Sequence, residues 1–441
     1  MASCGLVLCV RQYRCWEIDS MNKEFKKFDM KAPPIRQRQW LRPITWALSF
    51  PFTMAQKTKI IKKNCEGLKP PYLLICNHNA FFDFMVATHA IFPHRANYVV
   101  AIDGFFGFPL KKWLLRNVGG ICKRKFTTDL VLIRQIKRVL ANGDVLILYP
   151  EARYSDCGTP SELPESLGQM CKMMKVPVVT LNCKGHHLKT PVWNLKDRKI
   201  PYTEAYLTQL YTADQLKDAS AEEINAKLTE ALTYNDFAWQ KENNIKITVP
   251  YRAEGLHNVL YQCAHCHTEY EMSSKGDTLT CGHCGKSWRM TELGELVANE
   301  GETEFSHIPD WFEWEREQVR AEVESGKYSF EDEVEIYSLP RCYKYEPLGF
   351  GKLTHDPDEG FILTGHYRGK DFCIQRTPLQ TNSLHIEYDF LRMKPFDLVD
   401  ISTEDDSFYC YTTKKDVVTK LAFATEEIYR INLEKKRGKS D

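Results

Sequence analysis

The chain has 441 residues, too many for one compact hydrophobic core, so two or three domains are expected. Its hydrophobic fraction of 43% suits folded domains, and no stretch has the composition of low-complexity disorder. The net charge of +1 hides an uneven distribution of basic and acidic residues along the chain. Residues 1–150 hold 24 Lys and Arg against 9 Asp and Glu, whereas residues 251–441 hold 23 against 36. The basic first part suits an anionic partner (a phosphate ester, an anionic membrane or a nucleic acid), and it also suits a solvated basic face.

The N-terminal tail, residues 1–34, contains a short apolar run without a preceding basic residue or a cleavage site, which argues against a signal peptide. Met21 opens a more ordinary start, so we treat residues 1–20 as a candidate mis-assigned extension. No run of 18 apolar residues predicts a transmembrane helix. Residues 38–54 combine tryptophans and phenylalanines with arginines. This pattern fits both a segment lying in the membrane interface and a helix docked on the domain's own core.

Four near-continuous apolar runs predict strands buried on both faces of a sheet: residues 72–76, 97–102, 144–149 and 176–183. Helical patterns lie between them, at residues 81–92 and 127–143, and Gly143 stands where a helix commonly ends. Alternating strands and helices predict an α/β fold with a mostly parallel sheet flanked by helices. We assign this domain to residues 35–250.

Two C-x2-C motifs with fourteen residues between them predict a zinc ribbon within residues 251–300. Four thiolates suit tetrahedral Zn2+ and leave no position for water, so the metal is expected to be structural. The residues between the motifs predict a hairpin with a Gly-Asp turn. The predicted ligands are Cys263, Cys266, Cys281 and Cys284, and the neighbouring His265, His267 and His283 are not taken as ligands.

The rest of the chain predicts a helical linker and a second folded module. Residues 301–330 form an acidic, Trp-rich helical pattern. Residues 331–441 show short β-runs and then an amphipathic helix, which predicts a small α+β domain. The order is similar to that of pleckstrin-homology-like folds. No residue motif indicates what this module or the ribbon does.

The stretch CNHNAFFDF, residues 76–84, places a histidine and an aspartate five positions apart behind the first buried strand. The spacing is weak evidence, because about one such pair is expected by chance, and His366 with Asp371 forms another in a predicted strand and turn. Position is the stronger evidence, because α/β proteins bind ligands at the carboxyl ends of parallel strands. Residues five apart in one helix face different directions, so His78 must precede the helix while Asp83 reaches back from its first turns. Asp83 would then orient one ring nitrogen while the other faces a cleft, as in a catalytic dyad.

Two later segments place charged residues at comparable strand ends. Arg124 lies between Lys123 and Lys125 behind two glycines, which predicts a seat for an anion. Glu151 follows the strand at 144–149.

NHNAFFD, GGICKR, YPEARYS and VPVVTL, in this order, resemble the four sequence blocks of the glycerophospholipid acyltransferases, typified by 1-acyl-glycerol-3-phosphate acyltransferase. The resemblance covers roughly residues 35–210. The matching positions are Asn77, His78, Asp83, Gly119, Arg124, Pro150, Glu151, Ser155, Val176 and Pro177. The departures are Ile121 for an aromatic residue, Ala152-Arg153-Tyr154 for Gly-Thr-Arg, and Thr180 for a second proline.

The resemblance implies direct acyl transfer without an acyl-enzyme. His78 would act as general base toward the acceptor hydroxyl, and Asp83 would fix its tautomer and stabilise its charged form. Arg124, assisted by Lys123 or Lys125, would hold the acceptor's phosphate. Glu151 would help to shape that pocket, and Arg153 would supply what the missing arginine at position 154 supplies. Residues 101–117 carry aromatics beside two lysines and fit either an interfacial segment or a core loop.

The leading hypothesis is an acyltransferase that acts on a lysophospholipid such as 1-acyl-glycerol-3-phosphate, with acyl-CoA or acyl-carrier protein as donor. Its expected location is the cytoplasm, peripherally associated with the inner face of the membrane, and its scattered cysteines suit a reducing compartment. A non-catalytic lipid-binding or scaffold protein and a zinc-ribbon nucleic-acid binder are the alternatives. The complete set of His78, Asp83 and Arg124 argues against the first, and the acidic surroundings of the ribbon argue against nucleic acid as a partner. Donor, chain length, acceptor and oligomeric state stay open.

Overall fold

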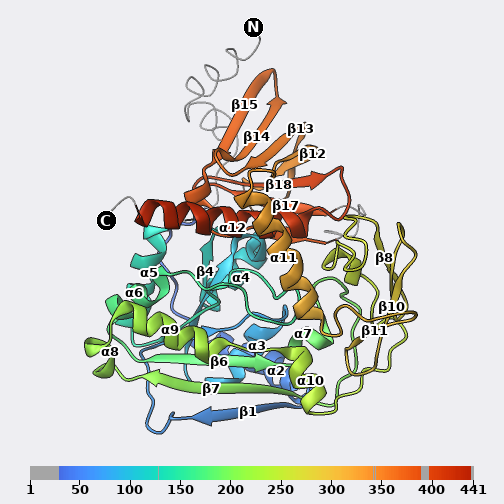
Figure 1. Ribbon diagram of the computed structural model, residues 1–441. Helices are drawn as coiled ribbons and strands as arrows, with labels where there is room; N and C mark the ends of the chain where they lie inside the picture. Colours follow the sequence, from blue (N-terminus) through green and yellow to red (C-terminus); the bar gives the residue numbers. More distant parts are fainter. Residues whose placement is uncertain (1–28, 128, 341, 343, 389–396, 439–441) are drawn as a thin grey trace.

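The computed structural model describes residues 29–438 except 128, 341, 343 and 389–396. The expectations for residues 1–28, including the start at Met21, lie outside the described residues. Over these residues the chain forms three sheets, with the third sheet and the C-terminal helix above the first sheet and the small second sheet at one side (Figure 1). In this part of the chain, no helix is both long and apolar enough to cross a membrane.

The first sheet has seven strands in the order β1-β7-β6-β2-β5-β3-β4. All neighbouring pairs are parallel except β6 and β7, so the predicted α/β fold with a mostly parallel sheet is confirmed. The strands are β1 (Thr58–Lys63), β2 (Tyr72–Cys76), β3 (Ala96–Ala101), β4 (Gly120–Lys123), β5 (Val145–Leu148), β6 (Val178–Lys184) and β7 (Thr203–Tyr211).

Helices cover both faces of this sheet. In β2, Leu73 and Ile75 belong to one core with α5, α6 and α9, whereas Leu74 and Cys76 belong to another with α3. Gly143 follows the end of α5 with φ +76°, the left-handed conformation that favours glycine. The helices of the domain are η1 (Gln39–Leu41), α2 (Arg42–Ala55), α3 (Asp83–Ala90), η2 (Ile102–Phe105), α4 (Pro109–Asn117), α5 (Leu130–Ala141), α6 (Ser166–Met174), α7 (His186–Lys189), α8 (Gln215–Asp218), α9 (Ala221–Leu232) and α10 (Asp236–Glu242).

Because β2, β3, β4, β5 and β6 run parallel, their carboxyl ends meet at one edge of the sheet. The segments that leave this edge contain His78, Asp103, Arg124, Glu151 and His186. This edge of the sheet therefore gathers the polar groups from which a site can be built.

The four cysteines lie in a four-stranded antiparallel sheet in the order β11-β10-β9-β8. The predicted hairpin is confirmed, because β8 and β9 pair on either side of Gly276 and Asp277. The elements of this part are η3 (Leu256–Asn258), β8 (Met272–Lys275), β9 (Thr278–Cys281), β10 (Ser287–Met290) and β11 (Leu296–Ala298).

The C-terminal module, residues 330–438, is a seven-stranded antiparallel sheet in the order β15-β14-β13-β12-β18-β17-β16, followed by one long helix. His366 and Asp371 are paired across the β14–β15 hairpin on the surface, 2.8 Å apart, which confirms a strand and turn there. The elements are β12 (Phe330–Ser338), β13 (Glu346–Asp356), β14 (Gly360–Tyr367), β15 (Lys370–Arg376), η4 (Pro378–Gln380), β16 (His385–Glu387), β17 (Leu398–Ser402), β18 (Ser407–Thr412) and α12 (Val418–Arg437).

Helix α11 (Ile308–Glu324) joins the four-cysteine sheet to the C-terminal module. Trp311 of α11 packs edge-to-face on Trp288 of β10, with ring centroids 4.9 Å apart. The next residue, Phe312, packs against Phe423 of α12, with ring centroids 4.6 Å apart. The ribbon, α11 and α12 therefore share one hydrophobic core.

Candidate active site and metal centre

His78 and Asp83 form a hydrogen-bonded pair at the carboxyl end of β2. His78 lies in the loop before α3, and Asp83 is the first residue of that helix. The Nδ1 atom of His78 lies 3.2 Å from Oδ2 of Asp83. The expected order, with the histidine before the helix and the aspartate reaching back, is the one found.

Asp83 is a buried carboxylate with donors on both oxygens. Oδ2 also accepts from the backbone N–H groups of Asn79 and Ala80, at 2.7 and 2.9 Å. Oδ1 accepts from Nδ1 of His186 at 2.6 Å. Burial raises the pKa of Asp83, but hydrogen bonds from His186 and His78 outweigh it and hold the pKa well below its usual range. Asp83 is therefore an anion at neutral pH and can orient His78.

The His78 imidazole lies between two tyrosines. The ring centroids of Tyr149 and Tyr154 each lie 4.3 Å from that of His78. The Nε2 atom forms no hydrogen bond with any described residue, and 19% of the side chain is exposed. Since Nδ1 faces Asp83, Nε2 is the ring atom available to take a proton.

Glu151 fixes the backbone beside this pair. Its Oε1 accepts from the N–H of His78 at 3.0 Å, and its Oε2 accepts from the N–H of Ser161 at 2.8 Å. Burial raises the pKa of Glu151 to about 7, although both N–H donors oppose that rise. The backbone N–H of Ser155 also donates to the carbonyl of His78, at 3.0 Å. Glu151 thus binds the His78 loop directly, a contact that the sequence did not predict.

The basic residues predicted to form an anion seat bind other parts of the chain. Arg124 is buried and donates to Sδ of Met30 and, at 2.6 Å, to the carbonyl of Asp405 in the C-terminal module. Lys123 donates to the carbonyl of Thr127 at 2.9 Å, and Lys125 pairs with Asp103 at 2.6 Å. Among the described residues, no hydrogen bond or ion pair joins these three side chains to His78 or Asp83.

Arg153 ties the loop after β5 to helix α12. Its Nη2 lies 2.9 Å from Oε1 of Glu426, and Nη1 lies 3.4 Å from Asp156. Glu426 also pairs with Arg316 of α11 at 2.5 Å and accepts from Ser383 at 2.6 Å. Both partners of the Arg153–Glu426 pair are buried, at 5% and 4% side-chain exposure. These ion pairs and hydrogen bonds connect the loop beside His78 to helices α11 and α12.

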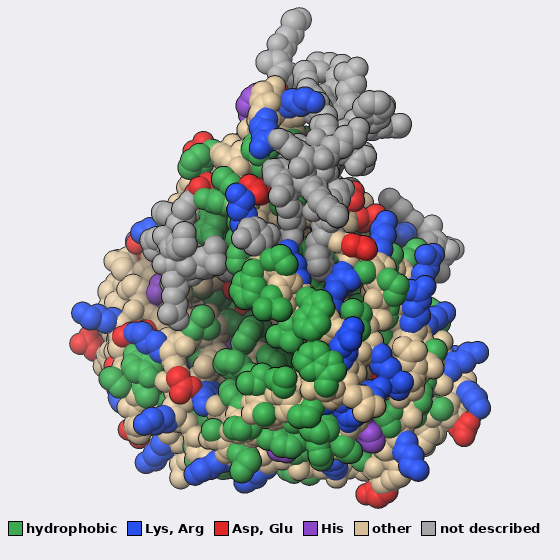
Figure 2. All heavy atoms as spheres, turned by 180° about the vertical axis from the view of Figure 1, so that it is seen from behind, with side chains coloured by type: hydrophobic (Ala, Val, Ile, Leu, Met, Phe, Trp, Pro, Cys, Tyr) green, Lys and Arg blue, Asp and Glu red, His purple; other side chains and the backbone are tan. Residues whose placement is uncertain are grey.

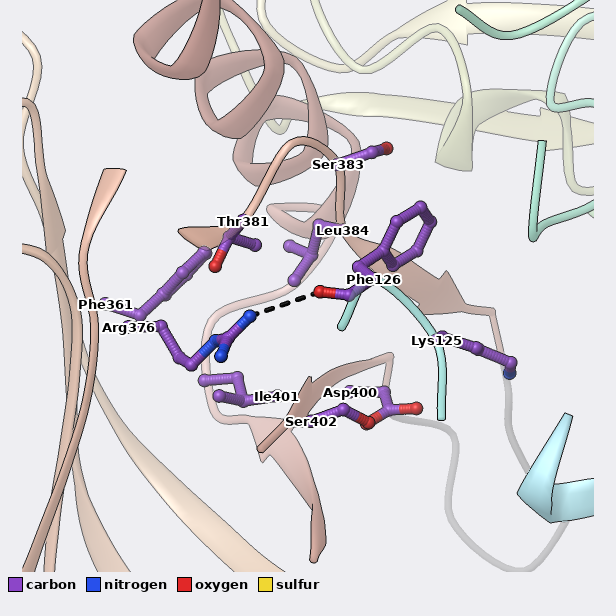
Figure 3. A pocket seen from close by; sticks show the side chains of 10 residues that line it. All are labelled: Lys125, Phe126, Phe361, Arg376, Thr381, Ser383, Leu384, Asp400, Ile401 and Ser402. Carbon is purple, nitrogen blue, oxygen red and sulfur yellow. Dashed lines mark hydrogen bonds between the residues drawn. The ribbon is translucent and has the colours of Figure 1, made fainter. Parts of the chain in front are cut away.

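The segment after Arg124 lies against the C-terminal module with little space between them. Figure 3 shows the pocket at this contact, where Arg376 reaches across to the carbonyl of Phe126, 3.1 Å away. The space holds about one water molecule. This pocket is therefore a filled interface and not a ligand site.

The four predicted zinc ligands come together. Their Sγ atoms all lie within 4.8 Å of one another, and the Cys263–Cys284 and Cys266–Cys281 pairs are 3.8 and 3.7 Å apart. A tetrahedron with Zn–S bonds of about 2.3 Å has sulfur–sulfur edges of about 3.8 Å. The cluster therefore fits one tetrahedral metal. His265 instead pairs with Glu304 at 3.0 Å.

Residues 53–184 match the family model described as Acyltransferase. This chain carries an acyltransferase domain. The matched segment spans β1 to β6 and includes His78, Asp83, Arg124 and Glu151. The glycerophospholipid acyltransferase resemblance stated from the four sequence blocks is thereby supported.

Part of the chain is also similar to a crystal structure of a bacterial enzyme. It is that of the 1-acyl-sn-glycerophosphate (LPA) acyltransferase, PlsC, from Thermotoga maritima, at 14% sequence identity and a TM-score of 0.35. The comparison covers 51% of this chain and 88% of that chain. No curated protein matches the sequence.

Sequence reasoning missed two residues in contact with the dyad, His186 and Tyr149, and a third, Glu426, that pairs with Arg153. His186 follows β6, and Tyr149 follows β5, so their positions at strand ends were a usable signal. Glu426 gave no signal, because a glutamate in an amphipathic helix far along the chain normally faces solvent.

The buried ion pair predicts a large stability effect. Glu426→Ala leaves Arg153 buried without its main counter-ion, so we expect the free energy of unfolding to fall by about 3–5 kcal/mol in urea denaturation. Glu434→Ala is the matched control, because Glu434 lies on the same helix with 62% of its side chain exposed. Equal stability of the two variants would contradict a structural role for the pair.

The cysteine cluster predicts a stoichiometric metal. We expect one zinc per chain by elemental mass spectrometry, and Cys263→Ser to lose the metal and to lower the thermal midpoint. Cys65→Ser is the control, because Cys65 is a free cysteine outside the cluster. Full metal content in Cys263→Ser would refute the four-cysteine site.

Proposed function

We propose that this protein transfers an acyl chain from a thioester to the hydroxyl of a lysophospholipid such as 1-acyl-glycerol-3-phosphate, with His78 as general base. The observation that carries the proposal is the place of the dyad. The Asp83-bound histidine lies three residues from an exposed run of phenylalanines, Phe81, Phe82 and Phe84. A proton acceptor at the margin of an exposed apolar surface suits a reaction on lipids.

That run is part of a larger exposed surface, here called the apolar face. Trp40 of η1 packs on Trp113 of α4 at 6.2 Å, and Phe52 of α2 packs on Phe82 at 4.8 Å, so the elements adjoin. Figure 2 shows hydrophobic side chains gathered on this side of the molecule. The apolar face comprises Trp40, Ile44, Leu48, Met54, Phe81, Phe82, Phe84, Phe108, Leu110, Trp113 and Leu114.

The apolar face supports membrane association. Monomeric soluble proteins rarely expose so many contiguous large apolar side chains. Exposed lysines adjoin them, such as Lys57 after α2 and Lys111 on α4, and they would favour an anionic lipid surface. The proposal therefore places the protein peripherally on the inner face of a membrane, and it selects the interfacial interpretation of residues 38–54 and 101–117.

In the proposed reaction, Nε2 of His78 takes the proton of the acceptor hydroxyl while the oxygen attacks the thioester carbonyl. The new C–O bond forms, the C–S bond breaks, and the imidazolium passes its proton to the thiolate that leaves. Asp83 holds Nδ1 and stabilises the charged ring. The donor is an acyl thioester, acyl-CoA or acyl-carrier protein.

The acceptor's phosphate would be held by Arg124, helped by Lys123. Arg124 must first exchange the Asp405 carbonyl for a phosphate oxygen. A hydrogen bond between a guanidinium and an anion is stronger than one to a neutral carbonyl, so a phosphate oxygen would compete with the Asp405 carbonyl for Arg124. Glu151 and Arg153 would contribute by fixing the loop beside His78 rather than by contacting the acceptor.

Zn2+ in the four-cysteine site would have a structural role in this proposal. Four protein ligands leave no open position for substrate. The ribbon shares its core with α11 and α12, and α12 carries Glu426, so the metal would stabilise the network that reaches Arg153. A non-catalytic lipid-binding protein is the second candidate, and the apolar face alone would also suit it.

The catalytic proposal predicts that His78→Ala abolishes acyl transfer. We expect purified protein to acylate lysophosphatidic acid from a labelled acyl-CoA, and the variant to lose activity by about 10²-fold or more because the general base is absent. His366→Ala is the matched control, because His366 also contacts an aspartate but lies on an exposed hairpin. Retained activity in His78→Ala, or no transfer with several acceptors and donors, would favour the lipid-binding candidate.

The apolar face predicts vesicle binding. We expect the protein to co-sediment with vesicles of phosphatidylglycerol and phosphatidylcholine, and Leu48→Asp to weaken this by about tenfold, because a charge cannot enter the apolar layer. Leu195→Asp is the control, because both leucines are 62% exposed and only Leu48 belongs to the apolar face. Equal binding of both variants would refute the membrane orientation.

A further inference from the structure

One carboxylate serves two histidines in this site. Oδ2 of Asp83 accepts a hydrogen bond from Nδ1 of His78, and Oδ1 accepts one from Nδ1 of His186. Oδ2 has two further donors from the backbone, whereas His186 supplies the one hydrogen bond to Oδ1 that the described residues make. The side chain of Asp83 is 1% exposed, so without His186 this oxygen would be a buried anion atom with no donor.

The backbone around His186 is held rigidly. Gly185 precedes it with φ +86°, and a Cβ there would approach Trp239 within 2.6 Å. The buried carboxylate of Asp236 accepts from the N–H of Gly185 at 2.9 Å and from the N–H of His187 at 3.1 Å. These contacts direct the His186 ring toward Asp83.

His186 does not reach the position of the reacting groups. Its Nε2 is buried and has no hydrogen-bond partner among the described residues. The partly exposed Nε2 of His78 lies on the other side of the shared carboxylate. A direct exchange of protons between His186 and an acceptor hydroxyl is therefore not available in this arrangement.

We infer that His186 is a positioning residue for the proposed acyl transfer: its Nδ1–H fixes Oδ1 of Asp83 so that Oδ2 is directed at Nδ1 of His78. The inference rests on the proposed function for its catalytic consequence. Its structural content, the bond from His186 to Asp83, does not depend on which acyl donor or acceptor is used.

The His186 bond also sets how tightly the Asp83–His78 pair holds a proton. A donor to a carboxylate stabilises the anion, so removing that donor makes the pair bind its proton more tightly. The pair would then lose its proton at higher pH, and the acid limb of kcat/KM would move to higher pH. The other titratable groups that face the three residues are Cys76, Tyr149, Glu151, Tyr154, Cys183 and Asp236.

Three variants test the inference. His186→Ala removes the donor, and His186→Asn keeps an N–H at about the position of Nδ1. His187→Asn is the control, because His187 is its neighbour, is also buried, and has no hydrogen bond to Asp83 among the described residues. We expect His186→Ala to lower kcat about tenfold or more with KM little changed. We expect kcat of His186→Asn to return to near the wild-type value. The acid limb should shift upward in His186→Ala alone.

A second measurement does not need acyl transfer. Diethyl pyrocarbonate modifies neutral imidazoles, so the pH dependence of its reaction at His78, resolved by fragmentation mass spectrometry, reports the protonation of that ring. We expect the midpoint to rise in His186→Ala and to stay at the wild-type value in His187→Asn. Thermal melts of all variants show whether each is folded.

The outcomes separate the two claims. If no variant and no wild-type protein transfers an acyl chain, the proposed function fails, and the modification midpoint still decides the role of His186. If His186→Ala leaves the midpoint and the acid limb unchanged, or if His187→Asn shifts them equally, the positioning role is refuted. Failure of His186→Asn to restore either quantity in a folded protein would also overturn it.

Discussion

The site depends on a single buried negative charge. An ionised carboxylate inside a protein is costly unless donors surround it, and Asp83 meets this condition with two imidazoles and two backbone N–H groups. The two backbone donors come from the turn that leads into α3, so the local chain supplies them. The second imidazole comes from the end of β6, which pairs directly with β2. The parallel sheet therefore brings together the two loops that this charge requires.

The same loops are linked to the far end of the chain. Glu151 binds the N–H of His78, and two residues later Arg153 pairs with Glu426 of α12. Helix α12 in turn packs on α11, which also packs on the cysteine sheet. The C-terminal parts are thus not appended to a complete acyltransferase domain. They supply the counter-charge that lets a buried arginine lie next to the candidate catalytic loop.

The contacts between the first domain and the C-terminal parts give a second explanation for the basic first part and the acidic C-terminal half of the chain. The basic first part suited an anionic partner, and part of that partner is the acidic C-terminal half itself. Within residues 1–150, Lys125 lies in the field of the Asp400 and Glu387 carboxylates. Arg124 donates to the carbonyl of Asp405, with the Asp406 carboxylate nearby. Just beyond these residues, Arg153 pairs with Glu426. Arginines that a family pattern assigns to substrate can be engaged within the chain, because a sequence block does not show what a distant module places against it.

The sequence was most informative where structure is local. The continuous apolar run at Tyr72–Cys76 predicted β2 to the residue, and the Gly-Asp turn predicted the hairpin between the cysteine pairs. The dyad was predictable because strand end, turn and helix start all lie within nine residues. Contacts between distant segments were not predictable: nothing near Arg153 indicates Glu426, and His186 was one of 13 histidines.

The position of the apolar face has a consequence for the chemistry. The phenylalanines that flank Asp83 are exposed, while the aspartate between them is buried. In the proposed function, this one short segment would set both where an acyl chain lies and where the base is held. A lipid acceptor lying on this face would then bring its hydroxyl toward Nε2 of His78 without leaving the membrane surface. The proximity of base and apolar face is thus a property of residues 76–84 themselves, and the rest of the fold serves to keep that segment in place.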